Sequence, residues 1–530
     1  MILIHPPLVK PSEPPAGIAK LSGALRHHGV KHRVLDANLE GILSLLEAPP
    51  PSSDTWTRRA FRHLSRHLAL LRSWRAYHDD GRYRRAVRDL KRLLEMAALP
   101  NRLRLGLANY EHEELSPARS KDLLRAAENP EENPFYPYFR IRLRELLERE
   151  QSSLIGISLN YLSQALSCFA MIGFLRREFP GVKLVLGGGL LTSWMRRPLW
   201  QNPFRGLVED LVAGPGEVPL ISLTDQKRIG NEYYRPNYDL LPMRDYLSPG
   251  PILPYSSSSG CYWNRCSFCP EKAEGNPYVT IPAEKVTLDL HRLVESEKPA
   301  LIHLVDNAVS PSLMKAISED PPGVPWYGFA RITPHLTDPD FCFSLRESGC
   351  VMLKLGLESG DQTVLDSLQK GINLGEASSA LENLKKAGIA TYLYLLFGTP
   401  SESLIEARRT LEFVARHADA IGFLNLAIFN MPIDNVPFGG PEARRVETKA
   451  FYEGDLSLYT GFDHPKGWSR QSVRQFLDKE FKRHPAVRPI LRRDPPVFTS
   501  NHAPLFVLNE AARSGASFFY GSERGKRSSE

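Results

Sequence analysis

The sequence has few cysteines and no long apolar run. Six cysteines in 530 residues do not make the disulfide framework of a small secreted protein. No stretch is long and apolar enough to cross a membrane. The residues from Met1 to Pro7 also lack the basic segment and following apolar run of a signal peptide. We therefore expect a cytoplasmic protein without a membrane span.

The excess of positive charge is modest and concentrated in one region. The formal net charge is +7, and much of the basic excess falls between Arg58 and Arg104. A basic patch can attract nucleic acid. A solvated helical face is the more frequent explanation of such a run, so the sequence argues against a nucleic-acid partner.

Residues 1–235 alternate short apolar strands with helices. The run from Ser153 to Ser158 is apolar throughout, as in a strand buried on both faces. This alternation predicts a doubly wound parallel sheet of the flavodoxin or Rossmann type. A helical insertion, rich in Arg and Leu, interrupts it at about residues 50–150, and we expect it to form surface helices that serve as a lid or a docking surface. Strands are expected at residues 1–4, 32–36, 153–158, 183–186 and 207–213, and helices at 17–28 and 162–179.

Residues 245–440 form a second α/β series. Its six strands alternate with helices, which predicts a partial (β/α)6 TIM-type barrel with chemistry at the carboxyl ends of the strands. Residues 441–530 are expected to be a separate C-terminal appendage, with Trp468, His502 and the aromatic cluster Phe518 to Tyr520, and a disordered end from Glu523 to Glu530. The barrel strands are expected at 252–255, 301–305, 326–330, 351–357, 390–397 and 420–427.

Three of the six cysteines lie together, directly after the first barrel strand. Cys261, Cys266 and Cys269 are separated by gaps of four and two residues, and no fourth cysteine lies nearby. Three thiolates can hold three corners of a four-iron cluster and leave one iron open. Structural zinc is the alternative, but it normally takes four ligands in two close pairs, and His303 or His335 would have to fold back to complete it. The other three cysteines are expected to be small buried hydrophobes: Cys168, Cys342 and Cys350.

The cysteine run resembles that of the radical S-adenosylmethionine (SAM) enzymes. In that family three cysteines follow the first barrel strand, usually with gaps of three and two, and an aromatic residue, here Phe268, precedes the third. The resemblance implies a 4Fe-4S cluster whose open iron chelates SAM. Reductive cleavage of SAM would yield a 5′-deoxyadenosyl radical, which abstracts hydrogen from a substrate. The first gap is one residue longer than usual, which leaves the geometry of the loop open.

Other strand ends carry residues that the resemblance assigns to SAM. Asp306, after the second strand, would hold the methionine amine, and Arg331, after the third, would pair with the carboxylate. Glu358 and Ser359, after the fourth, would face the ribose and the carboxylate, and the segment from Leu396 to Pro400 lies near the expected adenine position. The predicted SAM-binding residues are Phe268, Asp306, Arg331, Glu358 and Ser359.

The N-terminal half resembles the cobalamin-binding domain that precedes many radical SAM enzymes. Glycines after buried strands let a backbone approach a flat ligand closely, although ordinary tight turns would also use them. The Asp-x-His-x-x-Gly loop that supplies a histidine to cobalt is absent. The predicted cobalamin-binding residues are Gly187, Gly188, Gly214 and Glu217, and further matching pieces are His5 to Pro7, Pro15 to Gly17, Ser158 and Gln164.

Absences narrow the expected reaction. Cys168 is the only cysteine before the motif and none follows Cys350, so the chain lacks both the three N-terminal cysteines and the cysteines after the barrel that hold second clusters in the family it resembles. The resemblance then implies one cluster and a cobalamin-dependent methylation of an unactivated carbon. The alternatives are a radical rearrangement or cyclisation without methyl transfer and, in another class, a zinc-stabilised RNA-binding protein. The expected partners are an electron donor such as flavodoxin or ferredoxin and a small-molecule or peptide substrate that the sequence does not identify.

Overall fold

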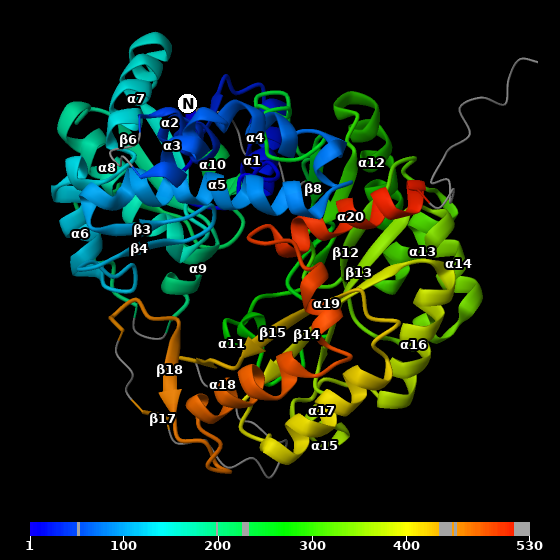
Figure 1. The fold of residues 1–530 in the computed structure, drawn as a ribbon. Coiled ribbons are helices and arrows are strands. Elements are labelled where there is room, and N and C mark those ends of the chain that lie inside the picture. The colour runs from blue at the N-terminus through cyan, green and yellow to red at the C-terminus, as the bar shows by residue number, and fades with distance from the viewer. Residues whose placement is uncertain (50–53, 198–199, 225–232, 434–447, 450–452, 514–530) are drawn as a thin grey trace, which may run out of the picture.

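Two parallel sheets, each with helices packed against it, form the frame of the molecule (Figure 1). The computed structural model describes the chain except residues 50–53, 198–199, 225–232, 434–447, 450–452 and 514–530. Within the described part, no helix combines the length and the apolar character that crossing a membrane requires.

The N-terminal sheet has five parallel strands in the order β2-β1-β5-β6-β7. This is the flavodoxin strand order, so of the two predicted types of doubly wound sheet, flavodoxin and Rossmann, the structure has the first. Ligands of such sheets bind at the carboxyl ends of the strands, beside the point where the strand order reverses, here between β1 and β5. The strands are β1 (Ile2–His5), β2 (Arg33–Asp36), β5 (Leu154–Ser158), β6 (Lys183–Gly187) and β7 (Asp210–Leu211). The helices of this unit are α1 (Ala16–His27), α2 (Ala37–Glu47), α8 (Leu162–Glu178), α9 (Gly189–Met195) and α10 (Glu217–Ser222).

The second sheet has six parallel strands paired in chain order, which confirms the predicted partial barrel. Its edge strands do not pair with each other among the described residues, so the barrel stays open. The strands are β8 (Ile252–Tyr255), β11 (Leu301–Leu304), β12 (Trp326–Ala330), β13 (Cys350–Glu358), β14 (Ala390–Phe397) and β15 (Phe423–Ile428). The helices are α12 (Ala283–Glu297), α13 (Pro311–Glu319), α14 (Pro339–Glu347), α15 (Gln362–Ser367), α16 (Leu374–Ala387) and α17 (Leu404–Arg416).

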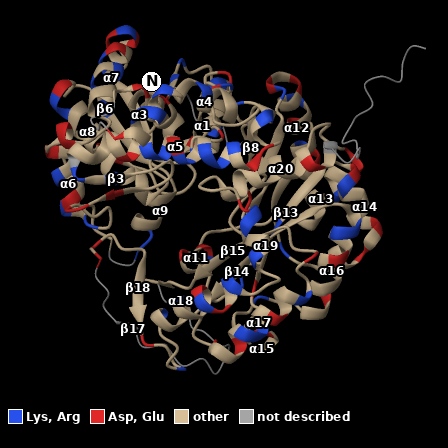
Figure 2. Ribbon diagram, viewed as in Figure 1, with Lys and Arg blue, Asp and Glu red and all other residues tan. Residues whose placement is uncertain are grey.

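The insertion is helical, as predicted, but it also carries a hairpin that the sequence did not suggest. The hairpin pairs two strands of three residues each. Lys and Arg mark the exposed side of α5 (Figure 2), and acids of the same helix pair with Arg84 and Arg85. This mixture of charges is typical of a solvated helical face. The elements are α3 (Thr55–Arg62), α4 (Leu64–Leu71), α5 (Asp80–Ala98), β3 (Leu103–Leu105), β4 (Tyr110–His112), α6 (Ser120–Glu128) and α7 (Tyr136–Glu150).

The C-terminal segment is not the separate appendage that the sequence suggested. Its last helix packs on β13 and β14. His502 in that helix is fully buried, and its Nδ1 is hydrogen-bonded with the Tyr83 hydroxyl of α5 at 2.9 Å. Trp468 packs edge-on against Phe476. The aromatic cluster Phe518 to Tyr520 and the end from Glu523 to Glu530 lie outside the described residues. The elements are β16 (Met431–Pro432), β17 (Thr448–Lys449), β18 (Tyr459–Phe462), α18 (Arg470–Lys479), α19 (Arg488–Arg493) and α20 (Thr499–Arg513).

A buried hydrogen-bonded chain joins the two sheets inside the open barrel. Glu13, between β1 and α1, accepts a bond from His303 Nδ1 on β11, 3.0 Å from each carboxylate oxygen, and one from Asn501 Nδ2 of α20 at 3.2 Å. Lys354 on β13 donates to His303 Nε2 at 3.2 Å, and its Nζ lies 4.6 Å from the Tyr327 ring centroid. Burial lowers the pKa of His303 and lowers that of Lys354 to about 8. Glu13 is therefore the one anion among groups that burial pushes toward neutrality.

The loop after β14 contains a buried carboxyl group. Glu402 is fully buried, and its Oε2 accepts a bond from the Gly398 amide, whereas Oε1 has no partner among the described residues. Burial raises the pKa of Glu402 to about 8, so the group is mostly a neutral acid at pH 7.

Removing the Glu13 carboxylate should destabilise the fold strongly. In Glu13→Ala, His303 and Lys354 keep their buried positions without the carboxylate that accepts from His303, and a buried donor left without its partner costs about 1 to 3 kcal/mol. Denaturant unfolding measures this cost, and the double variant Glu13→Ala, Lys354→Met should recover part of it. Arg408→Ala, which breaks the exposed pair with Glu480, is the control and should cost less than about 1 kcal/mol. Equal losses in Glu13→Ala and Arg408→Ala would contradict the role of Glu13.

The Glu402 carboxyl should make stability depend on pH between 5 and 8. Its pKa in the folded protein, about 8, lies above the value in the unfolded chain, so its contribution is complete at low pH. That contribution is lost as the pH rises through the folded pKa, by up to about 1.4 kcal/mol per pH unit.

Thermal unfolding of Glu402→Gln at pH 5, 6, 7 and 8 tests this expectation. The variant should gain stability relative to the wild type as the pH rises. Glu406→Gln is the control, because desolvation at Glu406 is outweighed by hydrogen bonds from Ser403 and Lys466 that lower its pKa to about 2, so its effect should stay constant over this range. A constant difference for Glu402→Gln would show that the carboxyl is already ionised at pH 5.

Candidate functional site

The cysteine loop follows β8 and is shaped by two residues in the left-handed region. Gly260 has φ of +70°, and a Cβ there would lie 2.4 Å from the Pro277 carbonyl oxygen, so only glycine fits. Asn264, inside the first cysteine gap, has φ of +43°, a conformation that asparagine tolerates. A left-handed turn there takes up chain length without widening the loop. The longer first gap is therefore compatible with a closed loop.

The three thiols lie close enough to influence one another. Burial raises the pKa of Cys266, and the nearby Cys261 thiol raises it further. Burial also raises the pKa of Cys269 to about 11, with a further contribution from Cys266. Groups of this kind are poor free nucleophiles, whereas a metal that replaces their protons removes the cost of the buried charge. The loop thus suits metal ligation better than nucleophilic catalysis.

Three of the predicted SAM residues gather over this loop. The Arg331 guanidinium lies 4.2 Å from the Trp263 ring centroid, and its Nη1 is 3.9 Å from the Cys266 sulfur. Lys370 Nζ pairs with Glu358 Oε1 at 2.8 Å and lies 5.4 Å from the Phe268 ring centroid. Arg331, Glu358 and Phe268 therefore stand beside the thiols, where charged groups could meet the two ends of a zwitterionic ligand. Their contacts with SAM stay predictions.

The side chains of the other two predicted SAM residues make hydrogen bonds within the protein. Asp306 is buried and accepts bonds from the Ser257 and Ser258 hydroxyls at 2.8 and 2.6 Å, which fixes the segment that leads into the cysteine loop. Ser359 is fully buried, and its hydroxyl lies 3.1 Å from that of Thr410. Next to Asp306, Asn307 reaches the loop instead and donates to the Gly260 carbonyl oxygen at 3.2 Å. Asp306 and Ser359 thus position backbone, and direct contact of their side chains with SAM stays a prediction.

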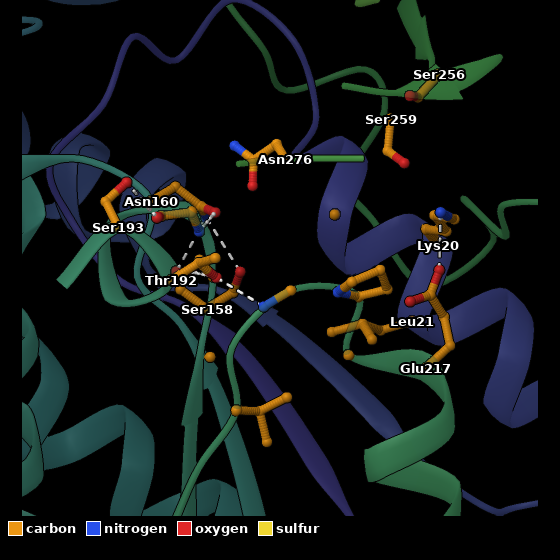
Figure 3. Close-up of a pocket in the computed structure, with 18 of the residues that line it drawn as sticks. Lys20, Leu21, Ser158, Asn160, Thr192, Ser193, Glu217, Ser256, Ser259 and Asn276 are labelled. Carbon is orange, nitrogen blue, oxygen red and sulfur yellow. Dashed lines mark hydrogen bonds and ion pairs between the residues drawn. The ribbon is translucent and has the colours of Figure 1, made fainter. Parts of the chain in front are cut away.

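A cavity of about 770 Å³ lies between the N-terminal sheet and the barrel (Figure 3). All four predicted cobalamin residues line it, as does the start of the cysteine loop from Ser258 to Gly260. Tyr459 of β18 lines another part of the wall. One cavity therefore contacts both predicted cofactor sites. The predicted cobalamin residues on its wall are Gly187, Gly188, Gly214 and Glu217.

The glycines of this cavity serve different purposes. Gly188 has φ of +109°, and a Cβ there would lie 2.3 Å from the Leu159 carbonyl oxygen, so the backbone alone requires glycine. A Cβ at Gly187 would meet nothing closer than 3.6 Å, so the fold does not require glycine there. A side chain at Gly187 would instead fill part of the cavity. This favours the interpretation that Gly187 lets a ligand approach closely over the interpretation that it serves an ordinary turn.

The cavity has an apolar part and a polar wall. Its apolar lining includes Leu3 and Leu220, which lie beside Gly156 of β5. Glu217 is paired with Lys20 at 2.9 Å on one side (Figure 3). Of the other matching pieces, Gly17 and Ser158 line the cavity. Gln164 lies behind it and donates to the Pro6 carbonyl oxygen at 2.7 Å.

The alternative of a single zinc ion finds no support in the arrangement of side chains. His303 is engaged with Glu13 and Lys354 inside the barrel, and His335 is exposed and packs near Phe341. In the part of the chain that the structure describes, no three His, Cys, Asp or Glu side chains gather closely enough to hold one metal ion. A four-iron cluster holds its thiolates farther apart than a single ion does.

Known proteins resemble this chain in sequence over limited spans. An uncharacterized methyltransferase of Pyrococcus horikoshii is 26% identical over 206 residues, which are 37% of this chain and 43% of that protein. The anaerobic magnesium-protoporphyrin IX monomethyl ester cyclase of Cereibacter sphaeroides is 23% identical over 282 residues, 45% of each chain. The match thus spans less than half the length of both curated relatives.

Two solved structures resemble this one in fold. The radical SAM methyltransferase TsrM of Kitasatospora setae, solved with cobalamin and a 4Fe-4S cluster, superposes with a TM-score of 0.52 at 15% identity, covering 97% of this chain and 99% of its own. The cobalamin-dependent radical SAM enzyme OxsB, with aqua-cobalamin and SAM bound, gives a TM-score of 0.50 at 13% identity over 79% of this chain and 52% of its own. At this identity the likeness shows the fold alone.

The family assignment comes from the barrel. Residues 255–414 match the radical SAM superfamily, and they run from the end of β8 into α17, so they include all three cysteines. The match implies a 4Fe-4S cluster and SAM as cofactors. This chain therefore carries a radical SAM domain over residues 255–414.

Proposed function

We propose that this radical SAM enzyme is a cobalamin-dependent methyltransferase that acts on carbon. The observation that carries the proposal is the shared cavity, whose walls combine Gly187 and Gly214 of the N-terminal sheet with Ser258 and Gly260 of the cysteine loop. A ligand in this cavity would lie between the two predicted cofactor sites. The fold that the chain shares with TsrM over nearly its whole length supports the same reading.

The residues around the cysteines fit a cluster and SAM. Cys261, Cys266 and Cys269 would ligate three irons, and with SAM at the fourth the cluster supplies one electron for cleavage of a carbon–sulfur bond. Arg331, which has no carboxylate partner among the described residues, would receive the carboxylate of SAM. Glu358, held by Lys370, would accept hydrogen bonds from the ribose. Enzymes of this superfamily also require an electron donor.

The cavity fits a large, flat cofactor with apolar and polar parts. Cobalamin bound there would supply a methyl group. The described residues that line the cavity include no histidine, which agrees with the missing Asp-x-His-x-x-Gly loop and points to cobalt without an imidazole ligand from this chain. His5 is buried and is not among the lining residues.

Cyclisation or rearrangement without methyl transfer is the second candidate. It is supported by the similarity to the cyclase from Cereibacter sphaeroides, whereas the similarity to the methyltransferase from Pyrococcus horikoshii supports the first candidate. Product masses separate the two, because methylation replaces a hydrogen with one methyl group at each event and cyclisation adds no carbon.

Replacing Cys266 should remove the cluster and SAM cleavage together. Cys266→Ala leaves two thiolates for a cluster that needs three, so the anaerobically reconstituted protein should hold little iron and sulfide. It should form 5′-deoxyadenosine from SAM and dithionite at less than roughly a hundredth of the wild-type rate. Cys342→Ala, a buried cysteine away from the loop, is the matched control and should retain both. Cleavage of SAM by Cys266→Ala at the wild-type rate would contradict the assignment of Cys266 as a cluster ligand.

Filling the cavity at Gly187 should block cobalamin and spare the cluster. Wild-type protein should bind hydroxocobalamin in equilibrium dialysis, and Gly187→Val should weaken binding at least tenfold, because the side chain fits the local backbone but occupies the cavity. Iron content and SAM cleavage without substrate should be unchanged. Gly181→Val, at an exposed turn with open space around it, is the control. Wild-type protein that binds no cobalamin would refute the methyltransferase proposal.

A further inference from the structure

Arg196, the residue after α9, brings an unpaired positive charge to the cavity wall. Its Nη1 donates to the Glu274 carbonyl oxygen at 3.3 Å and to Asn276 Oδ1, and both acceptors are neutral. Among the described residues Arg196 makes no ion pair. The other cation on the wall, Lys20, is neutralised by Glu217 at 2.9 Å. Of the two cations on this wall, Arg196 is therefore the one whose charge is available to a ligand.

The free edge of the guanidinium points toward the N-terminal sheet. Arg196 Nη2 has no hydrogen-bond partner in the described structure and lies 3.8 Å from the place that a Cβ of Gly214 would take. Any larger residue at Gly214, whose φ is +77°, would be strained and would crowd this edge. The two carboxylates on the barrel side of the cavity, Glu271 and Glu274, belong to the segment that Nη1 contacts.

Polar groups continue from Arg196 along the same wall. Ser158, Asn160, Thr192 and Ser193 lie together on one side of the cavity, with Lys20 and Glu217 across from them (Figure 3). Thr192 Oγ1 accepts the Gly214 amide at 2.9 Å, which fixes the glycine beside the guanidinium. This wall is suited to an anion held by a preorganised arginine.

Cobalamin carries such an anion. Its peripheral side chains are neutral amides, and the phosphodiester of its nucleotide tail carries the negative charge outside the corrin ring. We propose that Arg196 binds this phosphodiester while its Nη1 holds the barrel segment around Glu274 and Asn276 against the cavity. The inference rests on the proposed function, and it assigns to this chain a residue that selects cobalamin over forms without the nucleotide tail.

The experiment compares two ligands that differ in that tail. Equilibrium binding of hydroxocobalamin and of cobinamide, which lacks the nucleotide and its phosphodiester, is measured for wild type, Arg196→Gln, Arg196→Lys and the exposed control Arg144→Gln. Loss of a charge-assisted contact with phosphate should weaken cobalamin binding by Arg196→Gln roughly 10- to 100-fold. Cobinamide binding should change less than about threefold, since the lost contact involves only the tail. Arg196→Lys keeps the charge and should fall between wild type and Arg196→Gln.

Salt gives a second readout that a purely structural role would not move. Added sodium chloride should weaken cobalamin binding by the wild type more than by Arg196→Gln, because salt screens the contact that only the wild type makes. Iron content of each variant shows that it has folded around its cluster. The control Arg144→Gln should match the wild type for both ligands.

The outcomes separate the inference from the proposed function. Equal weakening of both ligands, unchanged cobalamin binding, or failure of Arg196→Lys to retain any preference for cobalamin would overturn the role of Arg196 while leaving cobalamin binding intact. Wild-type protein that binds cobinamide as tightly as cobalamin would do the same. A wild type that binds neither ligand would overturn the proposed function itself.

Discussion

An incomplete barrel has to be covered, and this requirement shapes the whole molecule. Six strands leave an inner face that a closed barrel would bury. Here α20 packs on β13 and β14, and the connection between β1 and α1 inserts Glu13 against His303. The cover comes from both ends of the chain. The N-terminal sheet and the C-terminal helices are therefore parts of one core, and the cavity lies between that sheet and the barrel.

The regular elements were predictable because their patterns are local. The limits of β14 and α1 agree with the predicted ranges to within one residue, since a buried parallel strand and an amphipathic helix each show their period within a dozen residues. The hairpin of β3 and β4 was missed because strands of three residues are too short to show a period. The packing of α20 was missed because the partners of His502 lie more than 400 residues away in the sequence.

The site could be predicted in its position but not in its orientations. The cysteine spacing and its place after the first barrel strand were enough to expect a cluster. Whether Asp306 and Ser359 point to a ligand or into the protein depends on strand register and loop conformation. In the structure, Asp306 is hydrogen-bonded with Ser257 and Ser359 with Thr410. Glu13 gave no signal, because a single acid in a proline-rich loop has no pattern. Arg196 gave none either, because its meaning lies in the absence of a carboxylate partner.

The position of Tyr459 on the cavity wall has a consequence for how the enzyme is made. The ribosome releases the glycines of the N-terminal sheet first, the cysteine loop later and β18 after both. The cavity therefore acquires its last wall after both predicted cofactor sites have been translated. Until then the cysteine loop and the open barrel face solvent and oxidants. A cofactor that depends on every wall of this cavity can therefore be enclosed only after β18 has been synthesised.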